Sequence, residues 1–213
     1  MLPPDGLLQC PVCRSPLVAQ DRSVRCGSGH SFDVARQGYV NLLPGGTHTG
    51  TADTADMVAE RAGFLAAGHF EPIAEAVAEA AAECVAGAPG CVLDAGAGTG
   101  HYLARVLVAV PGRTGVALDL SKHAMRRAAR AHPRIVAAVC DSWGRLPVAD
   151  GAAALVLNVF APRNASEFGR VLAQGGSLIT VTPGPRHLGE LVDALGLIRV
   201  DADKERRLAA SDR

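Results

Sequence analysis

The feature that most constrains the fold is a glycine-rich stretch, Asp94-Ala-Gly-Ala-Gly-Thr-Gly100. It follows a short apolar run at 92–95 and precedes a segment, 101–110, whose apolar residues recur at helical spacing. Glycine lets the backbone turn sharply and approach a ligand closely. The helix beyond the turn offers free N–H groups and the positive end of its dipole. The sequence therefore predicts a strand, a tight loop and a helix that together hold a ligand.

The rest of the chain from residue 56 onward continues this alternation. Further helices are predicted at 57–67, 72–85, 122–131 and 167–172, and further strands at 115–120, 135–140, 154–159 and 177–181. Ser121 is suited to cap the helix that follows it, and Pro133 to stop that helix. Near-continuous apolar strands separated by helices indicate a mostly parallel sheet covered on both faces. The expected fold class is α/β, a doubly wound, Rossmann-like domain.

The spacing of the glycines bears on the cofactor. Dinucleotide sites use G-x-G-x-x-G, whereas here the third glycine comes one residue earlier and an acid, Asp94, precedes the set. This pattern is similar to motif I of the methyltransferases that depend on S-adenosylmethionine (SAM). Asp94, Gly96, Gly98 and Thr99 are therefore candidate cofactor contacts. A ligand-free turn and an NAD site are the alternatives.

Two acids at the ends of later strands extend the candidate site. Asp119 ends the second strand of the domain, where a carboxylate can accept both ribose hydroxyls, although NAD sites use a similar acid. Asp141 follows the third strand, where methyltransferases often contact the adenine. The turn Gln174-Gly-Gly176 also resembles the one ahead of the fifth strand in that superfamily.

The N-terminal region carries a metal-binding pattern. Cys10, Cys13, Cys26 and His30 follow the spacing C-x2-C-x12-C-x3-H, which predicts a tetrahedral Zn²⁺ site. Four protein ligands leave no position for a catalytic water, so the zinc is expected to be structural. A segment of about 40 residues has too little core to fold without such a staple. The remaining cysteines are expected to be buried small hydrophobes, namely Cys84, Cys91 and Cys140.

Composition limits the function classes and the compartment. The 21 basic and 21 acidic residues balance, so an RNA-binding surface has to be a local patch. The start of the chain lacks a signal-peptide pattern, and no apolar run approaches the ~20 residues of a membrane span. A cytoplasmic protein with no membrane partner is expected, organised as a zinc-binding module at 1–43, a Gly/Thr-rich linker at 44–55 and a methyltransferase domain at 56–213.

At the level of whole strings, the sequence resembles the 23S rRNA (guanine-N1)-methyltransferases, and the resemblance covers nearly the whole chain. The zinc pattern and four strings carry it: Gly38-Tyr-Val-Asn-Leu-Leu43, Phe64-Leu-Ala-Ala-Gly-His-Phe70, Asn158-Val-Phe-Ala-Pro-Arg-Asn164 and Thr182-Pro-Gly-Pro-Arg-His-Leu188. The phrasing at 129–133 and 157–162 is closer to the tylosin-resistance branch than to the enterobacterial branch.

This resemblance implies methyl transfer from SAM to N1 of a guanine in a 23S rRNA hairpin near the macrolide-binding tunnel, with macrolide resistance as a consequence. It implies that the zinc module helps to recognise RNA, and it allows a homodimer. Phe70 matches a cofactor-contacting aromatic residue, although the family more often has tyrosine there. His187 matches a histidine near the cofactor or the target base, and a surface histidine is the alternative. The family also continues beyond residue 213, so we expect a C-terminally short domain that lacks the closing hairpin and exposes a sheet edge.

The resemblance names no catalytic base. Guanine N1 carries a proton that must leave during transfer, and Asp141, Asn158 and His187 are candidates by position only. A paired or stacked target base has to be flipped out. The basic helix Lys122–Arg134 is suited to meet phosphates, but a solvated outer face is the commoner explanation. The alternative functions are a small-molecule methyltransferase and a non-catalytic, zinc-containing RNA-binding protein.

Overall fold

A computed structural model describes residues 1–47, 50, 52–184 and 189–195. The chain divides into two compact units, 1–180 and 181–213. The first unit contains the N-terminal module and nearly all of the large sheet. The described part of the second contains helix α6 (Gly189–Leu195). None of the described helices combines the length and the apolar character that crossing a bilayer requires.

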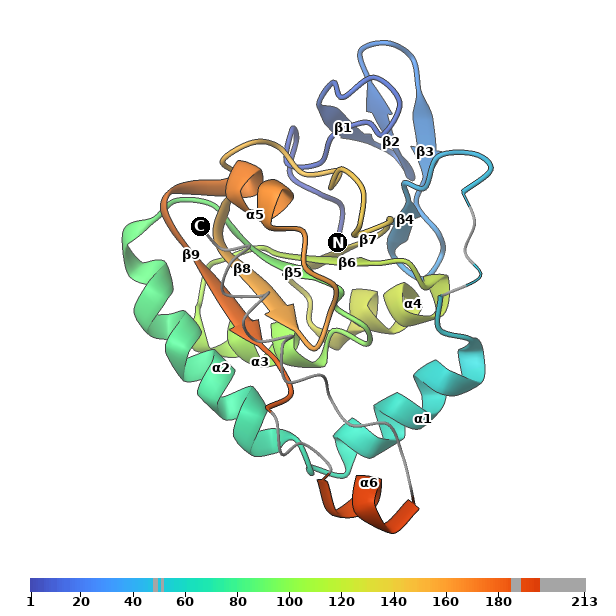
Figure 1. Cartoon of the computed structure of the whole chain (residues 1–213). Helices are drawn as coiled ribbons and strands as arrows, with labels where there is room; N and C mark the ends of the chain where they lie inside the picture. The colour runs from blue at the N-terminus through green and yellow to red at the C-terminus, as the bar shows by residue number, and fades with distance from the viewer. Residues whose placement is uncertain (48–49, 51, 185–188, 196–213) are drawn as a thin grey trace. The chain divides into compact units, whose positions relative to one another are not determined.

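Within the described residues, the large sheet has six strands. In spatial order they are β4 (Tyr39–Asn41), β7 (Ile135–Val139), β6 (Gly115–Asp119), β5 (Cys91–Ala95), β8 (Ala153–Val159) and β9 (Leu172–Val181) (Figure 1). All pairs from β4 through to β8 are parallel, which confirms the predicted parallel sheet. The chain builds outward from β5 in one direction and then in the other. Such a switch point leaves a crevice at the carboxyl ends of the central strands.

The predicted helices are all present, within two residues of their expected bounds. They are α1 (Ala55–Ala66), α2 (Glu71–Cys84), α3 (His101–Ala109), α4 (Lys122–Ala131) and α5 (Ala165–Val171), and a 3₁₀ turn (Val85–Gly87) follows α2. The Ser121 hydroxyl accepts the Ala124 amide at 3.3 Å and caps α4 as expected. Thr54 caps α1 in the same way and explains why α1 starts earlier than its apolar pattern does.

Strand β9 departs from its predicted start. It begins at Leu172 instead of residue 177, so the Gln174-Gly-Gly176 segment lies inside the strand. Gly175 has a φ of +77° there, a backbone conformation that side chains rarely adopt. The paired glycines therefore mark an irregularity within the strand and not a turn before it.

The N-terminal module packs against one face of the large sheet. Its strands β1 (Leu17–Gln20), β2 (Ser23–Cys26) and β3 (Ser31–Asp33) form an antiparallel sheet. Alternate strand residues such as Leu93, Val116 and Val136 pack in one cluster with Leu8 and Leu17 of the module. Helices α3 and α4 lie on the opposite face (Figure 1). The covered sheet is as expected, but on one face the zinc module shares the covering layer with helix α5, whose Phe168 and Val171 lie in the same cluster.

Strand β4 joins the module to the sheet. Residues 39–41 fall within the range 1–43 expected for the module, yet they pair with β7 in the large sheet. A bridge between Val34 and Val40 links the same strand back to the module. The small and large sheets are therefore connected through backbone hydrogen bonds as well as through their shared core.

Arg134 has a structural role although the sequence groups it with the basic helix. Its guanidinium donates to the carbonyls of Val110 and Arg113 at 3.0 and 2.7 Å, and also to the carbonyl of Leu107. These carbonyls belong to the end of α3 and the turn after it, where helix carbonyls lack intrahelical partners. Arg134 thus caps α3.

Replacing Arg134 with methionine is expected to lower the free energy of unfolding by about 1–3 kcal/mol, because partly buried carbonyls lose charged donors. Chemical denaturation measures this loss. Arg127→Met is the control, because Arg127 is exposed on α4, and it should change stability by less than about 0.5 kcal/mol. Equal effects of the two substitutions would contradict the capping role.

Candidate functional site

The glycine loop leaves β5 at the switch point of the sheet. Gly96, Gly98 and Gly100 all have positive φ angles, of +89°, +52° and +78°. A Cβ on Gly96 would lie 2.4 Å from the Cβ of Ala161, far inside contact distance. Glycine at this position is therefore required both by the backbone conformation and by the close approach of the loop after β8.

Asp119 fixes the loop from the end of β6. Its Oδ2 accepts the Gly98 amide at 2.9 Å, and its Oδ1 accepts the Ser121 amide at 2.8 Å. Burial raises the pKa of this carboxyl, and the two amides act in the opposite direction. Each carboxylate oxygen can accept a further hydrogen bond. The contact of Asp119 with ribose hydroxyls stays a prediction. Its hydrogen bond to the Gly98 amide, which holds the loop, was not predicted from the sequence.

A cavity of about 300 Å³ opens over the glycine loop. Five residues proposed from the sequence line it: Phe70, Asp94, Gly96, Gly98 and Thr99. The sequence did not assign the other lining residues to the site, and these include Arg61, Phe64, His101, Tyr102 and Phe160. The rings of Phe64 and Phe160 stand edge-on to Phe70, with centroids 5.6 and 6.0 Å away. The cavity therefore combines a polar glycine loop with an aromatic wall.

Asn158 holds the loop that carries Phe160. Its buried Nδ2 donates to the carbonyl of Ala95 at 3.2 Å and to that of Pro162 at 2.9 Å. These bonds tie the end of β5 to the loop after β8, where Phe160 has a φ of +51°. The sequence made Asn158 a candidate base; here its Nδ2 positions the loop, and its buried Oδ1 has no hydrogen-bond partner among the described residues. The Asn158-Val-Phe160 string was the available signal for Phe160, but a positive φ cannot be read from sequence.

Asp94 lies on the floor of the cavity and is almost fully buried. Its Oδ2 has no hydrogen-bond partner among the described residues. Burial, and secondarily the charge of Asp119, raises its pKa from 3.8 to about 7. A buried carboxylate without a partner is costly, so a cationic ligand group would be strongly favoured beside it.

The raised pKa of Asp94 predicts a pH-dependent stability. Unfolded Asp94 releases its proton near pH 3.8 and folded Asp94 near pH 7, so the folded state loses stability as pH rises through that interval. Asp94→Asn removes this loss. Its stability relative to the unmodified protein is expected to grow by about 2–3 kcal/mol between pH 5 and pH 8. Denaturation of the ligand-free proteins at both pH values measures the difference, and a difference that does not change with pH would contradict the assignment.

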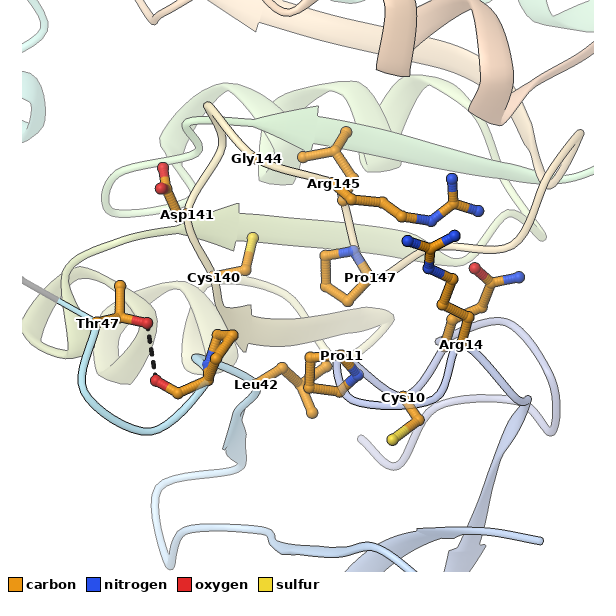
Figure 2. Close-up of a pocket in the computed structure, with 13 residues that line it drawn as sticks. Cys10, Pro11, Arg14, Leu42, Thr47, Cys140, Asp141, Gly144, Arg145 and Pro147 are labelled. Atoms are coloured by element: carbon orange, nitrogen blue, oxygen red, sulfur yellow. Dashed lines mark hydrogen bonds between the residues drawn. The ribbon is translucent and has the colours of Figure 1, made fainter. Parts of the chain in front are cut away.

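Asp141 lines a different cavity from the one over the glycine loop. Its Oδ1 accepts the Trp143 amide at 2.9 Å. The second cavity, of about 250 Å³, lies between the zinc module and the loop after β7, and Arg14 and Arg145 reach toward each other across it (Figure 2). Asp141 is therefore not among the residues that line the glycine loop cavity, and its contact with the adenine stays a prediction. His187, the remaining candidate, lies outside the described residues.

The four predicted metal ligands converge in the N-terminal module. All ligand atoms lie within 4.8 Å of one another. The His30 Nδ1 is 3.3 Å from the Cys26 Sγ and 3.6 Å from the Cys10 Sγ, and the Cys13 and Cys26 sulfurs are 3.5 Å apart. Tetrahedral Zn²⁺ with Zn–S bonds of ~2.3 Å requires ligand separations of roughly 3.5–3.8 Å. The Cys3His set therefore fits structural zinc.

The other cysteines divide into two kinds. Cys91 and Cys140 are buried, as expected, and burial raises the pKa of the Cys91 thiol to about 12. Cys84 is exposed, so the expectation of a buried hydrophobe was wrong for this residue. It continues the spacing of the buried Val77 and Ala81, but it is the last residue of α2, where the buried face of the helix ends.

Known proteins match both parts of the chain. The family model described as the N-terminal domain of RlmA, a zinc ribbon, matches residues 8–48, and a methyltransferase-domain model matches residues 92–176. A solved structure from Methanococcus maripaludis, described as an S-adenosyl-L-methionine-dependent methyltransferase, superimposes with a TM-score of 0.57 at 20% identity. The match covers 79% of this chain and 85% of that one, and it supports the fold alone.

Two relatives are much more similar in sequence. The 23S rRNA (guanine(748)-N(1))-methyltransferase of Streptomyces fradiae is 58% identical over 203 residues, which cover 95% of this chain and 72% of the relative. A Micromonospora griseorubida protein named for guanine-N1 methylation of 23S rRNA is 56% identical over 222 residues, covering 96% of this chain and 75% of the relative. The chain therefore belongs to the family of SAM-dependent 23S rRNA (guanine-N1)-methyltransferases.

Proposed function

We propose that this chain methylates N1 of the 23S rRNA guanine that corresponds to base 748, the target named for the Streptomyces fradiae relative. The observation that carries the proposal is that one sheet supports both a cofactor-type cavity and a zinc module. The glycine loop cavity opens at the switch point, and the closed Cys3His centre belongs to a module packed on the same strands. A small-molecule methyltransferase would have no evident use for the second site.

The lining of the glycine loop cavity suits SAM. When bound there, SAM supplies a methyl group already activated on a sulfonium. The buried Asp94 carboxylate would pair with a cationic group of the ligand, and its unpartnered Oδ2 is available for that contact. Asp119 would accept the ribose hydroxyls while it keeps Gly98 in place. Phe64, Phe70 and Phe160 would exclude water from the methyl group.

Transfer to guanine exchanges one bond for another. The bond from methyl carbon to sulfur breaks, the bond from that carbon to N1 forms, and the N1 proton has to leave. Asp141 and His187 stay the candidate acceptors for that proton. The enzyme otherwise contributes alignment, which is the larger part of catalysis for an activated donor.

Two measurements test the proposed function. Calorimetric titration with SAM should give saturable binding that Asp119→Ala weakens at least about tenfold, because the loop loses its anchor and the ribose its acceptor. Primer extension on 23S rRNA should give a stop at the proposed guanine only in cells that express the chain. SAM binding without any new stop would favour a small-molecule substrate, and absence of SAM binding would leave a non-catalytic RNA-binding protein.

The organisation proposed with this function is a zinc module at 1–43, a linker at 44–55 and a methyltransferase domain at 56–213. A 23S rRNA hairpin is the proposed partner and the cytoplasm the proposed location, because the substrate is ribosomal. A homodimer is proposed from the family resemblance. Sedimentation equilibrium should then give about twice the chain mass of 21.9 kDa, and a monomer at every concentration would contradict it.

A further inference from the structure

A row of basic side chains on α4 lines a hollow beside α1. His123, Arg126, Arg127 and Arg130 recur at helical spacing, so they share one face of α4. Ala55 and Val58 of α1 form the facing wall of this hollow, which has a volume of about 520 Å³. The basic residues therefore border a concave site and not only a convex outer surface. We call it the α4 groove.

Among the described residues, the charges of the α4 groove have no counter-charges. No carboxylate lines it, and within the described part of the chain Arg126, Arg127 and Arg130 make no ion pair or side-chain hydrogen bond. Other arginines are paired, as Arg105 is with Glu71 and Arg170 with Glu167. Helix α1 carries Asp56 and Glu60, but neither contributes to the lining of the groove.

This arrangement is unfavourable for the helix itself. Like charges three and four residues apart repel, and Lys122 adds a cation at the positive end of the helix dipole. Helix α4 contains no acid that would offset these terms. The clustering also stands out in a chain whose basic and acidic residues balance at 21 each. An anionic ligand would remove the repulsion.

We infer that the α4 groove binds consecutive phosphates of the RNA substrate, an inference that rests on the proposed function. From His123 to Arg130 the row extends about 10 Å along the helix, longer than one phosphate group and suited to a nucleic acid strand. Helix α1 connects the groove to the chemistry, because Ala55 and Val58 line the groove while Arg61 and Phe64 line the glycine loop cavity. RNA in the α4 groove lies one helix away from the cofactor cavity.

Contacts with phosphates position RNA and carry no sequence information. A triple variant in which Arg126, Arg127 and Arg130 are all replaced by glutamine should therefore bind the target hairpin more weakly. Its binding of an unrelated hairpin should fall by the same factor. Each lost contact corresponds to about fivefold at 0.15 M salt, so the triple variant should lose about 100-fold. The slope of log affinity against log salt should fall by about 2–3.

The experiment uses fluorescence anisotropy with a labelled transcript of the 23S rRNA hairpin around the proposed guanine and with an unrelated hairpin, across a range of salt concentrations. Arg127→Gln and Arg105→Gln make a matched pair, since each removes one positive charge, but Arg105 is already neutralised by Glu71 and Glu75. Only Arg127→Gln should weaken binding and lower the salt slope. Calorimetry with SAM checks that the variants keep the cofactor site.

The outcomes separate the groove from the proposed function. Unchanged affinity and unchanged salt slope in the triple variant would overturn the α4 groove while leaving RNA methylation by the unmodified chain intact. Loss of binding to the target hairpin alone would also overturn it, because phosphate contacts cannot discriminate between sequences. If the unmodified chain binds neither hairpin, both the proposed function and the groove fail.

Discussion

Replacing Cys26 with serine is expected to reduce bound zinc from about one ion per chain to near zero and to abolish RNA methylation. A serine hydroxyl is a poor Zn²⁺ ligand, and structural zinc sites contribute about 10–16 kcal/mol to the folding of small zinc domains. The module relies on this contribution because its three strands are short. Cys10 and Cys26 are also buried in the cluster that joins the module to the large sheet.

Elemental analysis of the purified protein measures the zinc, and a methyl-transfer assay on the rRNA hairpin measures activity. Cys84→Ser is the matched control, because this exposed cysteine lies outside the metal cluster. Cys26→His places a nitrogen ligand at this position in place of the sulfur and should restore zinc binding at least partly. This variant distinguishes a metal defect from a general folding defect. Full zinc content in Cys26→Ser would contradict the Cys3His centre.

Replacing Gly96 with alanine is expected to weaken SAM binding by at least about 100-fold, equivalent to about 2.8 kcal/mol. A Cβ at this position would lie 2.4 Å from the Cβ of Ala161, so the glycine loop or the loop after β8 has to move. The positive φ of +89° adds a penalty of about 1–2 kcal/mol for a residue with a side chain. Either loop forms part of the wall of the glycine loop cavity, so either movement would change the shape of that cavity.

Gly112→Ala separates the two causes. Gly112 has a similar φ of +79°, but a Cβ there would meet no atom within 4 Å, and it does not line the glycine loop cavity. This variant should lose some stability and bind SAM normally. Calorimetric titration of both variants tests the expectation. Equal SAM affinity in the unmodified protein and in Gly96→Ala would show that the cavity does not hold the cofactor.

Several features of the site could be predicted because they are local in sequence. The zinc ligands come in two close pairs, Cys10 with Cys13 and Cys26 with His30, and turns within each pair orient both ligands. The glycine loop is a continuous string between a strand and a helix. Helices such as α4 follow from periodic apolar residues together with a capping Ser121, and their bounds depend on few distant contacts.

Other features depend on residues that meet only in the folded chain. The aromatic wall joins Phe64 and Phe70, which lie near each other in sequence, to Phe160, which arrives from the end of β8. Asp141 follows a strand end much as Asp119 does, yet it lines the second cavity beside the zinc module. The sequence can place a residue at the end of a strand. Which cavity its side chain lines depends on the loops and on the zinc module that pack around that strand end.

The sequence alone determined the fold class, the zinc ligands and the glycine loop, because each is encoded by spacing within a short segment. The roles of the individual basic residues, in contrast, depend on how the chain folds. Arg134 and Arg127 belong to one basic segment, but Arg134 turns toward the end of α3 and caps its carbonyls, whereas Arg127 lines the α4 groove. Charge can be counted in a sequence, but its partners are set by the elements that pack around it.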